Sequence, residues 1–364
     1  MTDRECCIAC NCISGIGYRT FSALVEKFGC PANIPCHSKD EYLAVKGIGE
    51  KMASALENTD FELAATKEIN RAAAADVEIV TICDSSYPEI LRDLPSPPIA
   101  LYIAGTLPQN FDLALGIVGS RKITKYAQEQ TRKIAFEAAE NNFVIVSGMA
   151  EGADYFAHRA ALDAGGITVG VIGAGLENIY PAIHRDLADE IIASGGALIS
   201  ELPMQFPVTP TGFPRRNRII AGLSRGVLVT EAGLKSGSMI TADCAKKFSR
   251  MLFALPGRVD NTNVSGCHKL IKEGATLIDG FQDIAEKYDV PQIAGSFFDV
   301  KTTLPELSEE AKNIYEAIKN GANSSDLLVM KTGLPISSVN ANLMLLELQK
   351  VITREPDFTY RVLI

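Results

Sequence analysis

The 364-residue sequence has no apolar run near the roughly 20 residues that a membrane-spanning helix needs. Its first residues, Met1 to Glu5, are mostly polar or charged and lack the apolar segment of a secretory signal. These absences predict a cytoplasmic protein with no membrane partner. A chain of this length is also too long for one typical core, so we expect two or three domains.

A second pair of metal-ligand residues is missing as well. The chain has 9 cysteines, an odd count that, with no export signal, argues for reduced thiols rather than disulfides. Four of them crowd together near the start: Cys6, Cys7, Cys10 and Cys12. They could form a zinc or iron–sulfur site, or they could act as small hydrophobic residues on the buried face of a helix. Because no further cysteine or histidine pair follows at ligand spacing, the helical interpretation is favoured and no metal or cofactor is expected.

The dinucleotide-binding fingerprint GxGxxG is also absent. The loop after the first apolar run of the central region reads Gly116-Ile117-Val118-Gly119-Ser120-Arg121, without the later glycines of that fingerprint. An NAD site is therefore disfavoured. Gly119 nevertheless permits close backbone approach, Ser120 supplies a hydroxyl, and Arg121 can bind a phosphate bidentately.

Short apolar runs and helical patterns alternate through the middle of the chain. The runs are continuous, as expected for strands buried on both faces, and they cover residues 113–118, 143–146, 168–172, 197–199, 227–229, 251–255 and 275–278. The clearest helical pattern between them is 125–140. This alternation predicts an α/β domain at 81–290 with a doubly wound parallel sheet, an extended Rossmann-like fold. Its ligands should lie beyond the carboxyl ends of the strands.

Smaller regions flank this domain. Residues 1–80 read as a helical domain of the sterile-alpha-motif or helix-hairpin-helix type, with two Gly-Ile-Gly turns that could contact DNA or simply pack. The proline-rich stretch 84–108 predicts extended chain with a strand at 99–103 and no regular helix. Residues 291–305 read as a linker, and 306–364 as a winged-helix-like domain. Its third helix is poor in Arg and Lys, so protein contact or packing is at least as plausible there as DNA binding.

A second loop that suits a phosphate begins with Ser147 and Gly148 and leads into a helix. Asp154 and His158 are one helical turn apart on that helix and could hydrogen-bond. They could form a catalytic pair or a structural one. Because no nucleophile neighbours them in the sequence, the structural interpretation is favoured.

Positive charge is concentrated in one part of the chain. The net charge is −9, which weighs against a protein that coats DNA everywhere. Between residues 213 and 258, however, 9 basic residues face 2 acids, which leaves +7. The strongest feature there combines an aromatic residue with an arginine cluster, to which Lys235 in the next loop adds a charge; the cluster comprises Phe213, Arg215, Arg216, Asn217 and Arg218. Arginines can neutralise phosphates and Phe213 can stack on a base, as a groove for single-stranded nucleic acid requires.

These motifs, taken together and in order, resemble the DprA/Smf family of DNA-processing proteins. The resemblance rests on residues 147–158, 213–224 and 231–238, on Ala254-Leu255-Pro256-Gly257, and on glycines 266 and 274 with their neighbours. It implies a homodimer, paired through the Rossmann-like domain, that binds and protects single-stranded DNA and loads a RecA-type recombinase during natural transformation. It also implies no catalysis. Carried over by position, the DNA pocket would contain Gly119, Ser120, Arg121, Ser147, Gly148 and residues 213–218.

An enzyme acting on nucleotides is the alternative. Related α/β folds include phosphoribohydrolases, in which an Arg and a Glu work beside a glycine-rich phosphate loop. Here Arg121 or Arg216 could combine with Glu231, whose carboxylate would stabilise an oxocarbenium-like centre. The Gly-Gly-x-Gly-Thr loop of those enzymes is absent from the sequence, which favours the DNA-binding hypothesis.

Overall fold

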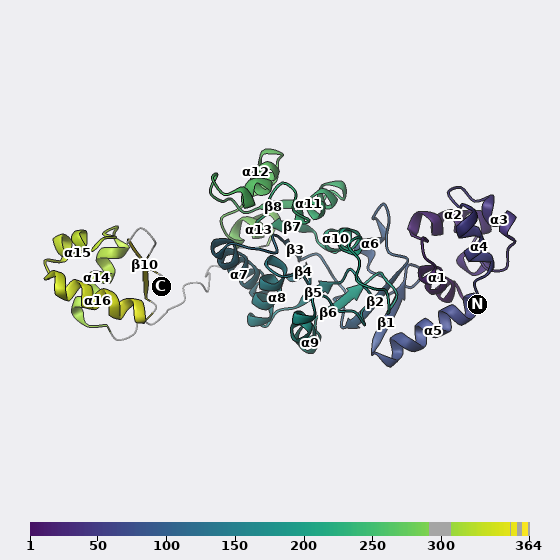
Figure 1. Ribbon diagram of the computed structural model, residues 1–364, viewed down its shortest axis with the longest axis horizontal. Coiled ribbons are helices and arrows are strands. Elements are labelled where there is room, and N and C mark those ends of the chain that lie inside the picture. The colour runs from purple at the N-terminus through teal and green to yellow at the C-terminus, as the bar shows by residue number, and fades with distance from the viewer. Residues whose placement is uncertain (291–306, 350, 355–358, 363–364) are drawn as a thin grey trace. The chain divides into compact units, whose positions relative to one another are not determined.

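The computed structural model describes residues 1–290, 307–349, 351–354 and 359–362 (Figure 1). The chain divides into two compact units, Met1–Gln292 and Ile293–Ile364. The predicted linker, 291–305, lies outside the described residues. Among the helices that the structure describes, none is both long and apolar enough to cross a membrane.

Within the described residues, nine strands of the first unit form one sheet in the order β1-β2-β6-β5-β4-β3-β7-β8-β9. From β6 to β9 all neighbours pair in parallel, which confirms the predicted α/β fold class. Every apolar run predicted as a strand lies in or overlaps a strand. The strands are β1 (Val77–Thr81), β2 (Ala100–Gly105), β3 (Ala114–Val118), β4 (Val144–Gly148), β5 (Thr168–Val171), β6 (Ala197–Ser200), β7 (Gly226–Val229), β8 (Met251–Ala254) and β9 (Thr276–Leu277).

Two features at one edge of the sheet differ from the expectation. Strand β1 pairs antiparallel with β2, and β2 pairs antiparallel with β6, so the sheet is mostly rather than wholly parallel. The strand β1 was not predicted, and it spans residue 80, where the predicted N-terminal domain ends. The proline-rich stretch also contains a short helix, α6 (Glu89–Arg92), so the exclusion of helix there was wrong. Pro88 occupies its N-cap, where a missing backbone N–H costs nothing.

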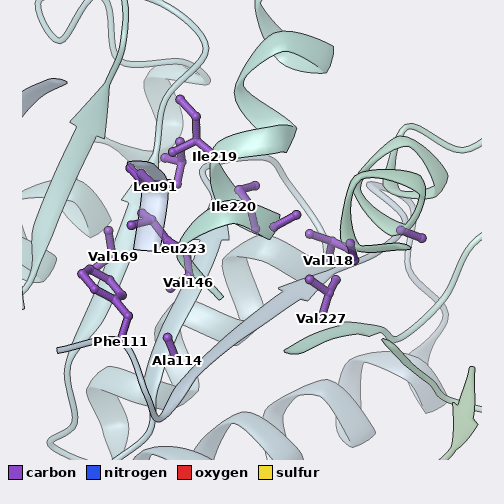
Figure 2. Close-up of a cluster of buried hydrophobic side chains, with 14 of the residues drawn as sticks. Leu91, Phe111, Ala114, Val118, Val146, Val169, Ile219, Ile220, Leu223 and Val227 are labelled. Carbon is purple, nitrogen blue, oxygen red and sulfur yellow. The ribbon is translucent and has the colours of Figure 1, made fainter. Parts of the chain in front are cut away.

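Helices cover both faces of the parallel part of the sheet. One face carries α7 (Lys125–Glu140), α8 (Ala153–Asp163) and α13 (Phe281–Lys287), with α9 (Arg185–Ala193) packed beside α8. The helix α7 has the predicted bounds. The other face carries α10 (Gly212–Leu223), α11 (Ser238–Lys247) and α12 (Ser265–Lys272). Figure 2 shows Ile219, Ile220 and Leu223 of α10 in the buried cluster that also contains Val146 of β4.

The N-terminal helices belong to the first unit and have a core of their own. They are α1 (Asp3–Cys12), α2 (Tyr18–Phe28), α3 (Lys39–Leu43), α4 (Glu50–Glu57) and α5 (Phe61–Ala74). The two Gly-Ile-Gly turns lead into α2 and α4, whose N-caps are Gly17 and Gly49. Gly15 and Gly47 have φ angles of 93° and 90°, a left-handed conformation that favours glycine.

The clustered cysteines lie mostly inside this helical core. Cys6, Cys7 and Cys10 are fully buried on α1 among apolar side chains. The Cys7 Sγ lies 3.5 Å from the Sγ of Cys83, and the Cys6 and Cys10 Sγ atoms are 3.9 Å apart. Within the described ranges, no three Cys, His, Asp or Glu side chains are arranged to hold a metal ion. The thiols therefore contribute to the apolar packing of α1.

The second unit has winged-helix order, as predicted. Its helices are α14 (Glu309–Lys319), α15 (Ser325–Thr332) and α16 (Ile336–Leu348), followed by the antiparallel pair β10 (Ile352–Arg354) and β11 (Tyr360–Val362). The Ser308 hydroxyl caps α14 by accepting a hydrogen bond from the Ala311 N–H. The exposed side of α16 is apolar, with Met344 and Leu348 65% and 71% exposed.

Candidate nucleic-acid interface

The strand order places the candidate site at one end of the sheet. Strand β3 lies between β4 and β7, and the connections after β3 and after β6 lead to opposite sides of β3, which makes a topological switch point. A cavity of about 280 Å³ opens there. Its lining comes from the loops after β3, β4 and β7, from α10, and from the first turn of α11. This is the position expected for a ligand of such a sheet.

A smaller cavity adjoins the first one. It shares Arg121, Ala150, Phe213 and Arg216 with its neighbour. Its remaining lining comes largely from loops after β4 and β5 and includes Met149, Ile172, Tyr180 and Pro181. The two cavities thus meet at Arg121 and Phe213. We call them the switch-point cavity and the aromatic cavity.

Arg121 and Phe213 form a cation–π pair between the two cavities. The Arg121 guanidinium carbon lies 5.1 Å from the centre of the Phe213 ring, although the residues are 92 positions apart. Arg121 is exposed and Phe213 is partly exposed. The structure therefore brings together the predicted phosphate-binding arginine and the predicted base-stacking aromatic residue.

The backbone of Gly152 packs closely against the loop that carries Arg121. This glycine has a φ of 81°, and a Cβ there would collide with the carbonyl groups of Ser120 and Arg121. The Ala153 N–H donates to the Ser120 carbonyl at 3.2 Å, and the Lys122 N–H donates to the Ser120 hydroxyl at 3.1 Å. The loop conformation thus depends on the absence of a side chain at position 152.

Arg216 lies beneath this pair and is almost fully buried. Its guanidinium contacts the Asp154 carboxylate at 3.5 Å, donates to the Asn217 side-chain oxygen at 2.9 Å, and donates to the Val171 carbonyl. Burial lowers the pKa of Arg216 and raises that of Asp154, because each charge has lost its water. All three guanidinium nitrogens have protein partners, so Arg216 supports the floor of the site more than it offers charge to a ligand.

Gly148 and His158 belong to the same buried floor. A Cβ on Gly148 would occupy the space of the Arg216 guanidinium, so this position requires glycine. The Gly148 carbonyl accepts from the Nε2–H of His158 at 2.7 Å, and the other ring nitrogen lies 2.7 Å from the Thr168 hydroxyl. Burial lowers the pKa of His158 to about 4, so the ring is neutral at physiological pH. The expected hydrogen bond between Asp154 and His158 was wrong, because each side chain has other partners.

The other two arginines of the cluster share one buried acid. The Arg215 guanidinium donates to Glu201 at 3.0 and 3.3 Å, and Arg218 donates to the same carboxylate. The Glu201 residue is 3% exposed. Its charge offsets one of the two positive charges, so the arginines of the cluster are less available to phosphates than their sequence indicates.

The remaining predicted residues differ in how they face the site. Gly119 and Asn217 line the switch-point cavity, and the Asn217 amide donates to the Gly237 carbonyl at 3.2 Å. Ser147 is fully buried, and its hydroxyl donates to the Ile117 carbonyl at 2.6 Å. Lys235 is exposed on the loop after β7, beside the first turn of α11.

Glu231, the acid of the enzymatic alternative, lies outside both cavity linings. It is fully buried and accepts hydrogen bonds from the backbone N–H and the hydroxyl of Thr124, the N-cap of α7. A carboxylate in that position fixes the start of a helix. Because it lines neither cavity, it is not placed beside Arg121 or Arg216 as the enzymatic alternative requires.

Two residues of the site were missed by reading the sequence. Tyr180 faces the aromatic cavity from the loop after β5, and its ring lies 5.7 Å from that of Phe213. Glu201 directly follows β6 and lies 12 positions before the cluster begins, outside residues 213–258. A Tyr-Pro pair after a Gly-Ala-Gly loop was visible in the sequence, but nothing local connects it with Phe213.

Comparison with known proteins identifies the family of this chain. Residues 78–289 match the family described as DNA recombination-mediator protein A, and residues 300–357 match the DprA winged helix domain. Protein Smf of Escherichia coli (strain K12) is 38% identical over 283 residues, covering 74% of this chain and 73% of that protein. DNA processing protein DprA of Streptococcus pneumoniae is 40% identical over 214 residues, covering 57% of this chain and 73% of that protein.

Two solved structures are similar as well. The X-ray structure of DNA processing protein A from Streptococcus pneumoniae matches with a TM-score of 0.66 and 32% identity, covering 79% of this chain and 98% of that one. A structure of DNA processing protein A from Helicobacter pylori, which concerns the single-stranded DNA binding mode of that protein, also matches. Its TM-score is 0.51 and its identity 32%, covering 58% of this chain and 95% of that one. The resemblance seen in the sequence is thereby confirmed, and the chain belongs to the DprA/Smf family of DNA-processing proteins.

Proposed function

We propose that this protein binds and protects single-stranded DNA at the switch-point cavity and loads a RecA-type recombinase onto it as a homodimer paired through its Rossmann-like domain. The observation that carries the DNA-binding part is the pair of exposed Arg121 and partly exposed Phe213 between two cavities at the end of the sheet. The similarity to a Helicobacter pylori protein with a single-stranded DNA binding mode supports the same conclusion.

The chemistry of the pair explains a preference for single strands. An arginine neutralises phosphate charge in any nucleic acid, whereas an aromatic face can stack only on a base that has left its own stack. Lys235, exposed on the loop before α11, adds a second positive charge for phosphate. A duplex offers phosphates but no free base faces, so it should bind more weakly.

Fluorescence anisotropy of a labelled oligo-dT and of the same sequence as duplex tests this proposal. It should be measured at two salt concentrations for the wild type and for Arg121→Ala. A suitable control is Arg132→Ala, because Arg132 is similarly exposed but pairs with Asp163 away from both cavities. We expect the wild type and the control to prefer the single strand and Arg121→Ala to bind it less tightly. Equal affinity for both nucleic acids would overturn the proposal.

The partner and assembly parts need their own measurements. Light scattering coupled to size-exclusion chromatography should give twice the chain mass for a homodimer. Strand exchange by a bacterial RecA on DNA covered with single-strand-binding protein should be accelerated by the full-length chain. A monomer in solution, or an unchanged exchange rate, would contradict the respective part and leave DNA binding to be judged separately.

A further inference from the structure

Two thiols from distant parts of the first unit lie in contact. The Cys7 Sγ is 3.5 Å from the Cys83 Sγ, although 76 positions separate the two residues. Cys7 is fully buried on α1, whereas Cys83 is exposed in the turn that follows β1. The pair therefore combines one thiol that a small molecule can reach with one that is enclosed by the protein.

We infer that Cys83 and Cys7 form a thiol–disulfide modification site, at which a low-molecular-weight disulfide oxidises the pair to a bond that joins α1 to the end of β1. The Cys83 sulfur attacks one sulfur of the small disulfide, which breaks its S–S bond and releases one thiol. The Cys7 sulfur then attacks the Cys83 sulfur of this mixed disulfide and releases the second thiol. Each attacking thiol gives its proton to the sulfur that leaves. Two protein thiols are thus oxidised, and one small disulfide is reduced to two thiols.

The turn that carries Cys83 is held by several hydrogen bonds. The Arg92 guanidinium donates to the carbonyls of Ile82 and Asp84, each at 2.6 Å. The backbone N–H and the hydroxyl of Thr81 donate to the Asp84 carboxylate at 2.7 and 3.0 Å, which closes the turn. The backbone of Cys83 is therefore fixed before any oxidant arrives.

Arg4 attaches α1 to the same turn. It lies three positions before Cys7 on the helix, and its guanidinium donates to the Ile79 carbonyl of β1 at 2.8 Å. The same guanidinium lies 3.4 Å from the Asp84 carboxylate. Both cysteines are thus positioned by contacts other than their own. Two groups held together in this way react with a high effective concentration.

A second thiol contact on α1 lacks these features. The Sγ atoms of Cys6 and Cys10 are 3.9 Å apart, and both residues are fully buried. They lie four positions apart on one helix, where Cβ atoms are about 5–6 Å apart, whereas a disulfide needs about 3.5–4.5 Å. Because neither access nor helix geometry favours a bond there, this pair serves as an internal control.

Burial also affects the chemistry of the reactive pair. It raises the pKa of Cys7 and, to a smaller extent, that of Cys83, so both thiols keep their protons at neutral pH. Oxidation should therefore be slow, because the thiolate is the attacking species. The reduced pair also gains no stability from an ionised sulfur, in contrast to the reduced forms of strongly oxidising protein disulfides. The equilibrium is correspondingly favourable for the bond.

The bond would change how the N-terminal helices are held. It closes a loop of the chain that contains α2 to α5 and β1. Closing so long a loop removes conformations from the unfolded chain and thereby stabilises the folded unit. We expect the oxidised protein to unfold at a midpoint about 5 °C or more above that of the reduced protein. Reduction with dithiothreitol should restore the lower midpoint.

Peptide mass spectrometry of the full-length chain after incubation with glutathione disulfide at pH 8 tests the inference. Once free thiols are blocked with iodoacetamide, trypsin should release a cross-linked pair of peptides, 5–19 and 72–92. Fragmentation should place the bond between Cys7 and Cys83. The matched control is Cys36→Ser, because Cys36 is also exposed and its loss should leave the cross-link unchanged.

Two variants separate the chemical steps. Cys7→Ala should stop at the mixed disulfide, so that Cys83 carries one glutathione and no cross-link forms. Cys83→Ser should leave Cys7 reduced, because the oxidant cannot reach the buried thiol. Since Cys83 lies at the surface, this variant keeps the core intact and decides the question even where Cys7→Ala does not fold.

Several outcomes would overturn the inference. A wild type that stays reduced at Cys83, or that accumulates glutathione there without a cross-link, would contradict the assigned pair. A bond between Cys6 and Cys10 in its place would do the same, and an unchanged midpoint in the cross-linked protein would contradict the stabilisation. None of these results bears on the proposed function, since oligo-dT binding is measured on the reduced protein.

Discussion

Removing the Arg216 guanidinium should destabilise the protein more than it removes charge from the DNA site. In Arg216→Ala the carboxylate of Asp154 stays almost fully buried and loses its only ion-pair partner among the described residues. Breaking a buried ion pair by removing one partner costs about 3–5 kcal/mol. The substitution also removes hydrogen bonds to Val171 and Asn217, so the upper part of that range is expected.

The size of this loss should depend on pH. Burial raises the pKa of Asp154 in the folded state, and Arg216 is the strongest of the groups that oppose the shift. For an acid whose folded pKa is raised, stability is fully present below the unfolded pKa and is lost as the pH rises through the folded pKa. Without Arg216 the folded pKa rises further. The penalty of Arg216→Ala should therefore be larger at pH 8 than at pH 5.

Urea denaturation followed by circular dichroism at the two pH values measures this prediction. The double variant Asp154→Asn with Arg216→Ala is the control, because a neutral amide cannot become an isolated buried charge. It should be more stable than Arg216→Ala alone at pH 8 and should show little dependence on pH. A penalty for Arg216→Ala that is the same at both pH values, or one below about 1 kcal/mol, would refute the assignment of Arg216 to the floor of the site.

Three further predictions follow from the site and the thiols. Arg121→Ala should reduce the salt dependence of oligo-dT binding by about 0.7 in log–log slope, and Arg215→Ala by clearly less, because the Arg215 guanidinium already donates two hydrogen bonds to the buried Glu201 carboxylate. Anisotropy at four salt concentrations would show equal slopes if this is wrong. Gly152→Ala should lower stability by about 1–2 kcal/mol or more and weaken DNA binding, because a side chain there is strained and displaces the Arg121 loop; an unchanged thermal midpoint would contradict this. Iodoacetamide at pH 8 should modify exposed Cys36 long before buried Cys7, whose pKa is raised by burial; equal labelling in peptide mass spectra would refute the burial of Cys7.

Long-range pairing explains most of what sequence reading missed. The parallel strands and α7 were predictable because each carries a continuous apolar run or a helical stripe within a few residues. The strand β1 follows shortly after α5 and pairs antiparallel with β2, about 20 residues later. Four of its five residues, Val77, Ile79, Val80 and Thr81, are β-branched, which is a local strand signal that was overlooked; only its antiparallel pairing needed the structure.

In the candidate site, too, local motifs predicted some residues correctly, whereas contacts with distant parts of the chain were not predictable. Arg121 and Phe213 were predicted from the chemistry of their own loops, and the structure brings them together. The charge of the cluster was overestimated, because Glu201 reaches Arg215 and Arg218 from the end of another strand. Arg216 lines both cavities, but its guanidinium is buried and paired within the protein, which its sequence position did not show. A local motif shows that an arginine is present, but only the packing of β4, β5 and α8 around it decides whether its charge faces solvent or protein.

The antiparallel edge of the sheet has a consequence for dissecting this protein. Strand β1 pairs with β2 along its whole length, from Val77 opposite Ala104 to Thr81 opposite Ala100. A fragment that starts after residue 80 would lose almost the entire strand and leave the β2 backbone groups without partners on that side. Unpaired edges of this kind recruit other strands and promote aggregation. Fragments that test the sheet without its N-terminal helices should therefore begin before Val77, in the turn that follows α5.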